Sequence, residues 1–443
     1  MNHRTPILVA GILAAWVAAA VVGQPTKPAS APDSRRADAP PLATGLAGCA
    51  ARGCHGGPTT DTAGKPLPPS TLNACTVWLR GDRHADAFRV LLTQRSKDMI
   101  RLLKWDTTAE TDVRCLACHT TPSVAAGPPT PDVVRVRMDG VGCDACHTSP
   151  GRATSEWLDV HKSGTPADLT RCYGELGMKP LNATKVRAEV CAGCHVGAPA
   201  GDGLPVREVT HDLIAAGHPR LNFDYATFLA SMPPHWTEKG TPDPVGDWFT
   251  GKVTASQAGL RLTADQATRG QVWPELAAYN CISCHHVIPG TPGGTDWRQD
   301  RFAKGEAGKL PWAGIPYPLH QLLPDGTDAD FAKLMTKLNA DPAKVAAAAR
   351  TLDAKLASAP LPTAAAVLRS LNLDAAKLDW DDASQAYYAM AAVNRARPGR
   401  IPGDAIDGKL LALRDSLRKG PTGYDPAAVL KLLRQAAETM QRP

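Results

Sequence analysis

Residues 139–147 read DGVGCDACH, and the closing CDACH belongs to a set of five similar motifs. CLACH, CAGCH and CISCH occupy residues 115–119, 191–195 and 281–285, while a wider form, CAARGCH, occupies residues 49–55. In every motif a histidine directly follows the second cysteine. Two cysteines and an adjoining histidine are the pattern of covalent haem c attachment, in which the thiols bond the porphyrin and the histidine binds its iron. The motifs therefore predict a protein built around several haems.

The histidines distinguish haem from zinc. Paired cysteines also bind zinc, but tetrahedral zinc chemistry does not require the next residue to be histidine. Only 13 of the 443 residues are histidine, so five such neighbours by chance have a probability on the order of one in a hundred million. We predict five haem c groups. The attachment cysteines are Cys49, Cys54, Cys115, Cys118, Cys143, Cys146, Cys191, Cys194, Cys281 and Cys284, and the proximal iron ligands are His55, His119, His147, His195 and His285.

The first motif is the least regular, because four residues separate its cysteines. A disulfide with an incidental histidine is the alternative, and the four regular motifs downstream favour haem. LAGC at residues 46–49 also resembles a lipoprotein cleavage box, but it lies too far beyond the apolar N-terminal segment. Two cysteines remain, Cys75 and Cys172, which form a disulfide with each other or stay as free buried thiols.

The N-terminus predicts export. Arg4 precedes an uncharged apolar stretch from Ile7 to Gly23, and Ala18-Ala19-Ala20 is a cleavage signature of small residues. Residues 1–23 are thus a cleaved signal peptide or a retained membrane anchor near the lower length limit for a span. Both alternatives place the remaining chain outside the cytoplasmic membrane, in the periplasm or an equivalent compartment.

Composition divides the rest of the chain. Residues 24–44 read as a disordered Pro/Ala-rich tether, residues 45–325 as a pentahaem cytochrome c domain, and residues 326–443 as a helical region without haem. The expected fold class is mainly α with long irregular loops, since the chain holds 39 prolines and 38 glycines. Prolines and glycines are dense over residues 287–318, which predicts a loop over the last haem. Aromatic residues are only 5%, as expected where haems fill the interior.

Four segments of the C-terminal region predict helices, because each begins with aspartate and carries an apolar stripe. They are DADFAKLMTKL, DPAKVAAAARTLDAKLA, DDASQAYYAMAAVNRAR and DPAAVLKLLRQAAETM. This region packs against the haem domain or docks a partner, and packing is the safer interpretation. The formal charge of +6 without lysine or arginine runs argues against a nucleic-acid partner.

The ligand on the far side of each iron separates an electron carrier from an enzyme, because an open position binds substrate. The histidines outside the motifs and the signal segment are His84, His161, His211, His218, His235, His286 and His320. We favour His84, at the start of an amphipathic helix over residues 84–104, together with His161, His211 and His218. On one helix, His211 and His218 would share a face two turns apart, with Gly217 and Pro219 ending the helix near His218.

Several segments resemble the cytochrome c-554-like multihaem family, which is related to hydroxylamine-oxidoreductase and pentahaem nitrite-reductase cytochromes. They are WLRGDRHADAFRVL from Trp78, DGVGCDACH followed by EWLDVH, CAGCHVG from Cys191, HDLIAAGHPRLNFDY from His211, MPPHW, and CISCHH with DWRQ between Cys281 and Gln299. The resemblance covers about residues 45 to 302. It implies helices wrapped around closely stacked haems, and it carries the distal ligand role onto His84, His161 and His218.

Two departures limit the resemblance. The tetrahaem archetype has four sites where this chain has five, and the lysine-ended CxxCK site of the nitrite reductases is absent from the sequence. The sequence therefore predicts an exported electron carrier with mostly bis-histidine haems, working with redox partner proteins or a membrane respiratory complex. The alternatives are an oxidoreductase acting on nitrogen oxides or hydroxylamine at one five-coordinate haem, and a haem subunit of a larger respiratory complex docked through the C-terminal helices.

Overall fold

The computed structural model describes residues 43–220, 222–236, 241–270, 273–279, 312, 315–316, 318–337, 339–371, 373, 378–420 and 423–441. All of them belong to one compact unit of the chain, residues 41–443. They form helices and loops, and within these ranges there is no β-strand, only isolated antiparallel bridges such as Thr148 with Met178. The mainly α prediction is confirmed. The predicted signal segment, the fifth motif and His286 lie outside the described residues, as does most of the predicted loop at 287–318.

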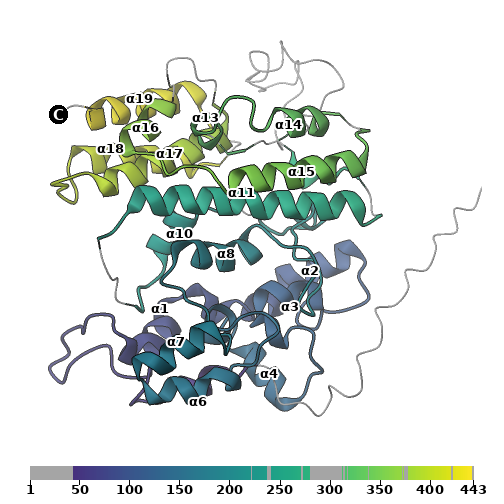
Figure 1. Cartoon of the computed structure of the whole chain (residues 1–443), viewed down its shortest axis with the longest axis vertical. Helices are drawn as coiled ribbons and strands as arrows, with labels where there is room; N and C mark the ends of the chain where they lie inside the picture. Colours follow the sequence, from purple (N-terminus) through teal and green to yellow (C-terminus); the bar gives the residue numbers. More distant parts are fainter. Residues whose placement is uncertain are drawn as a thin grey trace, which may run out of the picture. The chain divides into compact units, whose positions relative to one another are not determined.

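The helices divide between the motif-bearing segment and the C-terminal region (Figure 1). The first group is α1 (Ala74–Gly81), α2 (Gln94–Leu103), α3 (Val113–His119), α4 (Pro131–Met138), α5 (Cys143–His147), α6 (Ser155–Ser163), α7 (Pro166–Gly174), α8 (Thr184–His195), α9 (His211–Ala215), α10 (Tyr225–Ser231) and α11 (Pro244–Thr268). The second is α13 (Leu319–Leu322), α14 (Ala329–Met335), α15 (Pro342–Leu356), α16 (Ala364–Ser370), α17 (Trp380–Ala396), α18 (Ala405–Leu417) and α19 (Pro426–Gln441). Short 3-10 turns are η2 (Leu46–Gly48), η3 (Thr71–Asn73), η4 (Arg83–Asp86), η5 (Arg89–Leu92), η6 (Pro122–Val124) and η7 (Leu276–Ala278).

Helix α11 joins the two groups. It contacts α8 and α10 of the motif-bearing segment and α15 and α17 of the C-terminal region, and Figure 1 shows it between α8 and α15. Its start is fixed by the Asp243 side chain, which accepts a hydrogen bond from the Gly246 N–H at 2.9 Å, and by Pro244 in the first turn. The C-terminal helices therefore pack against the motif-bearing segment through α11, as the safer of the two interpretations expected.

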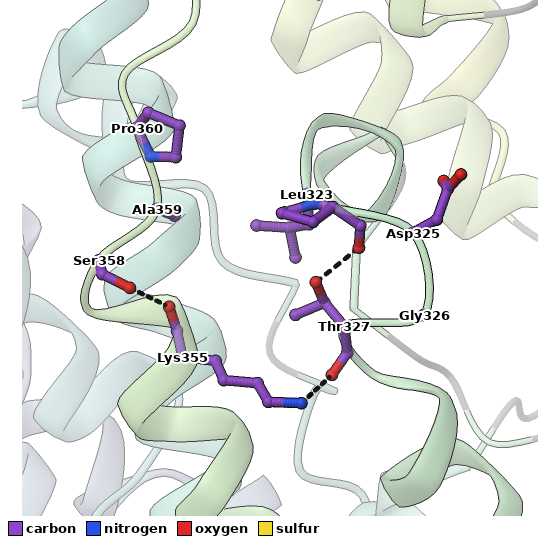
Figure 2. Close-up of a pocket in the computed structure, with 9 residues that line it drawn as sticks. Leu323, Asp325, Gly326, Thr327, Lys355, Ser358, Ala359 and Pro360 are labelled. Carbon is purple, nitrogen blue, oxygen red and sulfur yellow. Dashed lines mark hydrogen bonds between the residues drawn. The ribbon is translucent and has the colours of Figure 1, made fainter.

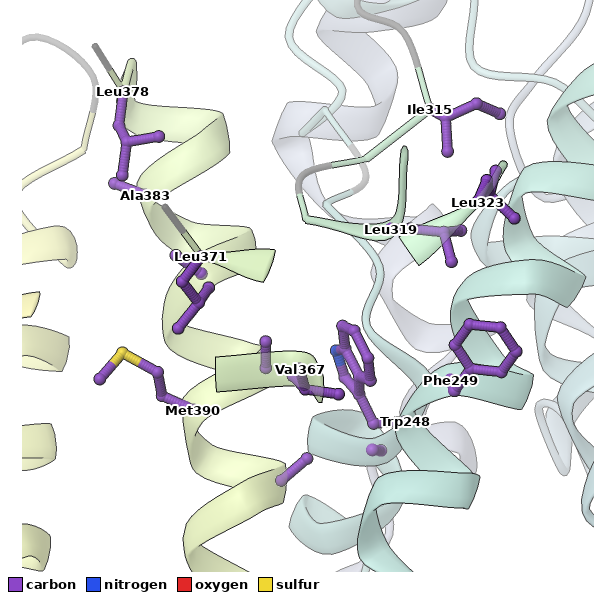
Figure 3. Packing of buried hydrophobic residues seen from close by; sticks show 14 of the residues in the cluster. Trp248, Phe249, Ile315, Leu319, Leu323, Val367, Leu371, Leu378, Ala383 and Met390 are labelled. Carbon is purple, nitrogen blue, oxygen red and sulfur yellow. The ribbon is translucent and has the colours of Figure 1, made fainter. Parts of the chain in front are cut away.

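The large apolar core lies on the C-terminal side of the molecule. It runs from α10 and α11 through α13–α19, and Figure 3 shows Trp248 of α11 among Val367, Leu319 and Phe249. The motif-bearing residues 43–220 contribute only small clusters, such as the one around Phe88 and Leu116. Side-chain burial is thus distributed very unequally between the two parts of the described chain.

The four predicted C-terminal helices are confirmed as α14, α15, α17 and α19. Three of these helices have an aspartate cap, and at α19 Asp425 accepts hydrogen bonds from the Ala427 and Ala428 N–H groups at 3.0 and 3.1 Å. Asp341 accepts a hydrogen bond from the Ala343 N–H at 2.9 Å, and Asp379, two residues before the predicted start, accepts one from the Asp382 N–H at 2.7 Å. These helices follow from local pattern and capping chemistry alone.

The predicted helix over residues 84–104 is wrong as a single element. The segment forms η4 and η5, and a regular helix, α2, starts only at Gln94. Thr93 is extended, with φ −73° and ψ 159°, and its side chain accepts from the Ser96 N–H. Asp82 in the same way accepts from the His84 N–H at 3.0 Å. These side-chain bonds to backbone compete with a continuous helix.

The predicted shared helix face for His211 and His218 is also wrong. Helix α9 begins at His211 and ends at Ala215, so His218 lies outside it. Gly217 adopts φ +120°, a conformation that ends a helix and suits glycine. The helix therefore ends earlier than the position of Pro219 indicates.

Candidate haem-binding sites

The three regular motifs in the described chain end helices. CLACH closes α3, CDACH forms α5, and CAGCH closes α8. In a helix, side chains three and four positions apart lie on the same face. Each motif therefore presents both cysteines and the histidine in one direction, which is the arrangement that attachment to a single porphyrin needs.

The first motif, residues 49–55, is built from turns instead. Cys49 follows η2, the Cys54 N–H donates to the Ala51 carbonyl at 2.9 Å, and the His55 N–H donates to the Cys49 carbonyl at 3.3 Å. Cys49 is buried and Cys54 is exposed. The extra two residues between the cysteines thus coincide with the loss of helical geometry.

Two aspartates of the DGVGCDACH stretch, residues 139–147, accept hydrogen bonds from the segment that leads into the first motif. The Gly45 N–H donates to Asp144 at 2.8 Å, and the Leu46 N–H donates to Asp139 at 2.9 Å. Asp144 is also bonded by the Thr154 hydroxyl, and its burial raises the pKa of its carboxyl. The DGVGCDACH stretch therefore fixes the position of the first motif as well as its own.

Three motif histidines each face a histidine from outside the motifs. The ring centroids of His55 and His161 are 6.0 Å apart. Those of His195 and His84 are 5.9 Å apart. Those of His119 and His218 are 6.4 Å apart. All three partners were predicted distal ligands.

These spacings fit one iron between each pair of rings. Metal–imidazole bonds are about 2 Å long, so two imidazoles on opposite sides of one metal ion have ring centroids roughly 6 Å apart. The ring nitrogens also suit iron binding, because in three of these rings Nδ1 already contacts an oxygen atom of the protein. His119 Nδ1 lies 2.8 Å from the Ala87 carbonyl, His218 Nδ1 lies 2.8 Å from the Pro219 carbonyl, and His84 Nδ1 lies 2.9 Å from Asp82. Such bonds leave Nε2 with its lone pair available for a metal.

The comparisons with known proteins agree with this chemistry. Residues 72–148 match the family model described as cytochrome c554 and c-prime. The match covers about a sixth of the chain and contains the second and third motifs together with His84. It supports a c-type cytochrome with covalently bound haem c that takes part in electron transfer. No curated protein and no solved structure matches the chain.

His84, which lies within the matched residues 72–148, is held on two sides. Asp82, whose side chain is 2% exposed, bonds the ring, and this bond raises the pKa of the imidazole. On the backbone side, the Val141 N–H donates to the His84 carbonyl at 3.0 Å. Gly140 has φ +71°, and a Cβ there would lie 2.3 Å from the same carbonyl oxygen. Only glycine permits this approach, which explains the glycine in DGVG.

Burial keeps most of the other candidate ligands neutral, the form that binds metals. It lowers the pKa of His147 and of His195 to about 4. It also lowers the pKa of His119, His161 and His218. A neutral imidazole offers a lone pair at physiological pH, so the site electrostatics suit iron ligation.

His147 is the remaining motif histidine in the described chain, and His235 is its candidate partner. Burial is the largest cause that lowers the pKa of His147, and the charge of His235 is the next. His211, a predicted ligand, begins α9, where its backbone N–H donates to Glu275 at 2.8 Å and its Nδ1 lies 3.9 Å from Asp212. The sequence favours His211 and does not place His235 among the favoured ligands.

Aromatic side chains that the sequence did not single out surround two of the histidines. Phe223 stacks on His195 with centroids 5.2 Å apart and an interplanar angle of 18°, and Phe228 meets the same ring edge-on at 5.2 Å. Trp157 meets His161 edge-on at 5.6 Å. These contacts orient the rings and exclude water from them.

The two cysteines outside the motifs are free and buried. Cys172 of α7 packs beside Trp157 and Met178, with its thiol 3.6 Å from the Trp157 carbonyl. Cys75 of α1 instead lies against Cys143, and this hydrogen bond lowers the pKa of Cys75 to about 7. The alternative of two free thiols, rather than a disulfide between them, is the one the structure has.

A pocket of about 310 Å³ lies away from the motifs, between the loop at residues 323–327 and the end of α15 (Figure 2). Three of its polar side chains donate hydrogen bonds to backbone carbonyls. Lys355 Nζ donates to the Thr327 carbonyl at 3.5 Å, the Thr327 hydroxyl donates to the Pro324 carbonyl at 2.5 Å, and the Ser358 hydroxyl donates to the Lys355 carbonyl at 3.0 Å. No histidine or cysteine lines it, and it adds nothing to the haem chemistry.

Within the described ranges, no helix is both long and apolar enough to cross a membrane.

Proposed function

We propose that this protein is an exported pentahaem c-type cytochrome that passes electrons between redox partners through haems with histidine on both faces. The observation that carries the proposal is the set of three histidine pairs with centroids 5.9 to 6.4 Å apart, each joining a motif histidine to a distant one. Two histidines per iron exclude substrate and keep the reduction potential below that of a histidine–methionine pair. Closed sites of this kind suit electron transfer rather than catalysis.

The proposed ligand pairs are His55 with His161, His119 with His218, and His195 with His84. His235 is the proposed partner of His147. The fifth proximal ligand is His285, and His211 remains a predicted distal ligand. Haem iron supplies the one-electron chemistry, while the chain orients the ligands and shields them from water.

Contacts between thiols of different motifs support neighbouring attachment points. The pKa of Cys118 is raised by its hydrogen bond with Cys194, and that of Cys143 by its hydrogen bond with Cys49. The second motif is therefore adjacent to the fourth, and the third to the first. Such proximity favours a connected haem series within residues 45–325.

Export and partners are further parts of this proposal. Residues 1–23 have the composition of a signal peptide or anchor, and family members of this kind usually lie outside the cytoplasm. We propose a periplasmic or equivalent location, with redox partner proteins or a membrane respiratory complex as electron donor and acceptor.

Electron paramagnetic resonance of the oxidised holoprotein tests the proposal, with haem content measured in parallel. We expect five haems per chain and five low-spin ferric signals, because every iron is closed by two histidines. One high-spin signal among five would favour the alternative of an oxidoreductase acting on nitrogen oxides or hydroxylamine at an open haem. Fewer than four haems would contradict the assignment of the motifs.

A further inference from the structure

The histidine pair of the first motif differs from two other pairs in the orientation of its rings. The ring planes of His55 and His161 are 21° apart, which is close to parallel. The pairs of the fourth and second motifs are close to perpendicular, with interplanar angles of 84° and 83°. The first motif therefore has a ligand geometry of its own among these three.

The ring of His161 also lacks the hydrogen bond that fixes other distal candidates. The Nδ1 atoms of His84 and His218 lie 2.9 and 2.8 Å from an oxygen atom of the protein. The Nδ1 atom of His161 is buried and has no hydrogen-bond partner in the described part of the chain. Its ring instead packs edge-on against Trp157, four residues earlier on α6, with centroids 5.6 Å apart and an interplanar angle of 83°. Packing against Trp157 thus takes the place of a hydrogen bond in orienting His161.

A chain of hydrogen bonds holds Trp157 in turn. Its indole N–H donates to the Thr148 hydroxyl at 3.2 Å, and the hydroxyl oxygens of Thr148 and Thr154 are 3.0 Å apart. Thr154 donates its only hydroxyl hydrogen to a carboxylate oxygen of Asp144, so Thr148 is the donor to Thr154. The other oxygen of Asp144 accepts from the Gly45 N–H at 2.8 Å. The four side chains are buried, and their bonds run in one direction, from the indole to the carboxylate within the third motif.

We propose that Trp157 is a positioning residue, which holds His161 nearly parallel to His55 and so gives the haem of the first motif an electronic structure unlike those of the second and fourth. The inference rests on the proposed function, since it requires iron between the two rings. An imidazole donates π-electron density to iron along the normal to its ring plane. Parallel rings therefore raise one of the two iron dπ orbitals, whereas perpendicular rings raise both alike. Ring orientation is thus a means by which the chain distinguishes one haem from its neighbours.

Electron paramagnetic resonance of the oxidised holoprotein measures this difference. Well-split dπ orbitals give a rhombic low-spin signal, and nearly equal ones give a highly anisotropic signal. His161→Ala identifies the signal of the first haem, and we expect it to remove a rhombic one. Trp157→Leu should shift that signal toward the highly anisotropic class while the iron stays low-spin, because the imidazole is retained but no longer held. Thr148→Val should cause a smaller shift in the same direction, since it removes only the acceptor of the indole N–H.

Trp380→Leu is the matched control. The Trp380 indole N–H is likewise hydrogen-bonded, to the Leu417 carbonyl at 2.8 Å, but this residue belongs to α17 and packs against the C-terminal core. Every haem signal should therefore match the wild type. An equal shift of the first-haem signal in Trp380→Leu would overturn the inference, because loss of any tryptophan would then suffice.

The remaining outcomes separate the inference from the proposed function. A highly anisotropic first-haem signal in the wild type overturns the near-parallel geometry. A rhombic signal that is the same in the wild type, Trp157→Leu and Thr148→Val overturns the role of Trp157, and if Trp157→Leu loses haem, Thr148→Val alone decides. These results leave the proposed function standing. Absence of haem from the wild type, or a spectrum that His161→Ala leaves unchanged, overturns the ligand pair on which both depend.

Discussion

At the scale of single residues, Asp82 orients the ring of His84 without any contribution from iron, since it bonds the ring Nδ1 at 2.9 Å. His84→Ala should convert one low-spin haem to high spin, because it removes the group that faces His195. Haem content should stay the same, since attachment depends on Cys191 and Cys194. Electron paramagnetic resonance with haem quantification measures both. An unchanged spectrum would remove His84 from the ligand set.

Asp82→Asn is the matched variant at the same site. The iron should stay low-spin, because the imidazole remains. Its reduction potential should rise, because a carboxylate partner makes the imidazole a stronger donor and so favours the ferric state. Redox titration checks the direction. A fall in potential would show that Asp82 does not act through the ring of His84.

At the scale of elements, a buried ion pair ties α10, α11 and α17 together. Lys252 lies 2.8 Å from Asp224, the two side chains are 3% and 1% exposed, and Lys252 also bonds Gln385 of α17. Lys252→Met should lower the free energy of unfolding by about 3–5 kcal/mol, because it leaves a buried carboxylate unpaired. Denaturant unfolding of the holoprotein followed by circular dichroism measures the loss.

Two further variants control this prediction. Arg261→Met removes an ion pair between α11 and α15 in which the arginine is 51% exposed, and we expect a loss of about 0–1 kcal/mol. Adding Asp224→Asn to Lys252→Met should recover part of the stability, because the buried charge is gone. Equal losses for Lys252→Met and Arg261→Met would show that α11 is not held by the buried pair.

The elements also show what sequence can predict. Amphipathic stripes and caps such as Asp341 are local, so the C-terminal helices could be foreseen. The helix breaks at Thr93 and Gly217 depend on particular side-chain bonds and a positive φ, which periodicity does not encode. The motifs predict haem attachment, because the chemistry of attachment fixes the spacing of the two cysteines and the histidine. Histidine pairs such as His55 with His161 join positions far apart in the sequence. Chemistry therefore suggested the candidate ligands, but only the folded structure shows which of them lie together.

At the scale of the whole molecule, the apolar core is distributed unequally, so we expect bound haem to contribute to the fold of the motif-bearing part. Burying a large apolar side chain contributes about 1.5–3 kcal/mol, while ordering each residue costs about 1–2 kcal/mol. The apolar clusters within residues 43–220 are small, whereas the core running from α10 through α19 is extensive. In the holoprotein the covalent haems would supply the missing apolar contacts.

A chain produced without haem should therefore keep its C-terminal core and lose the order of its motif-bearing part. Hydrogen exchange followed by mass spectrometry should show α15, α17 and α19 equally protected with and without haem, and these helices serve as the internal control. Peptides from α3 and α5 should lose their protection in the haem-free chain alone. Equal protection of α3 in both forms would mean that protein contacts suffice to fold the motif-bearing part. The haems would then be additions to a finished fold, rather than the interior around which it forms.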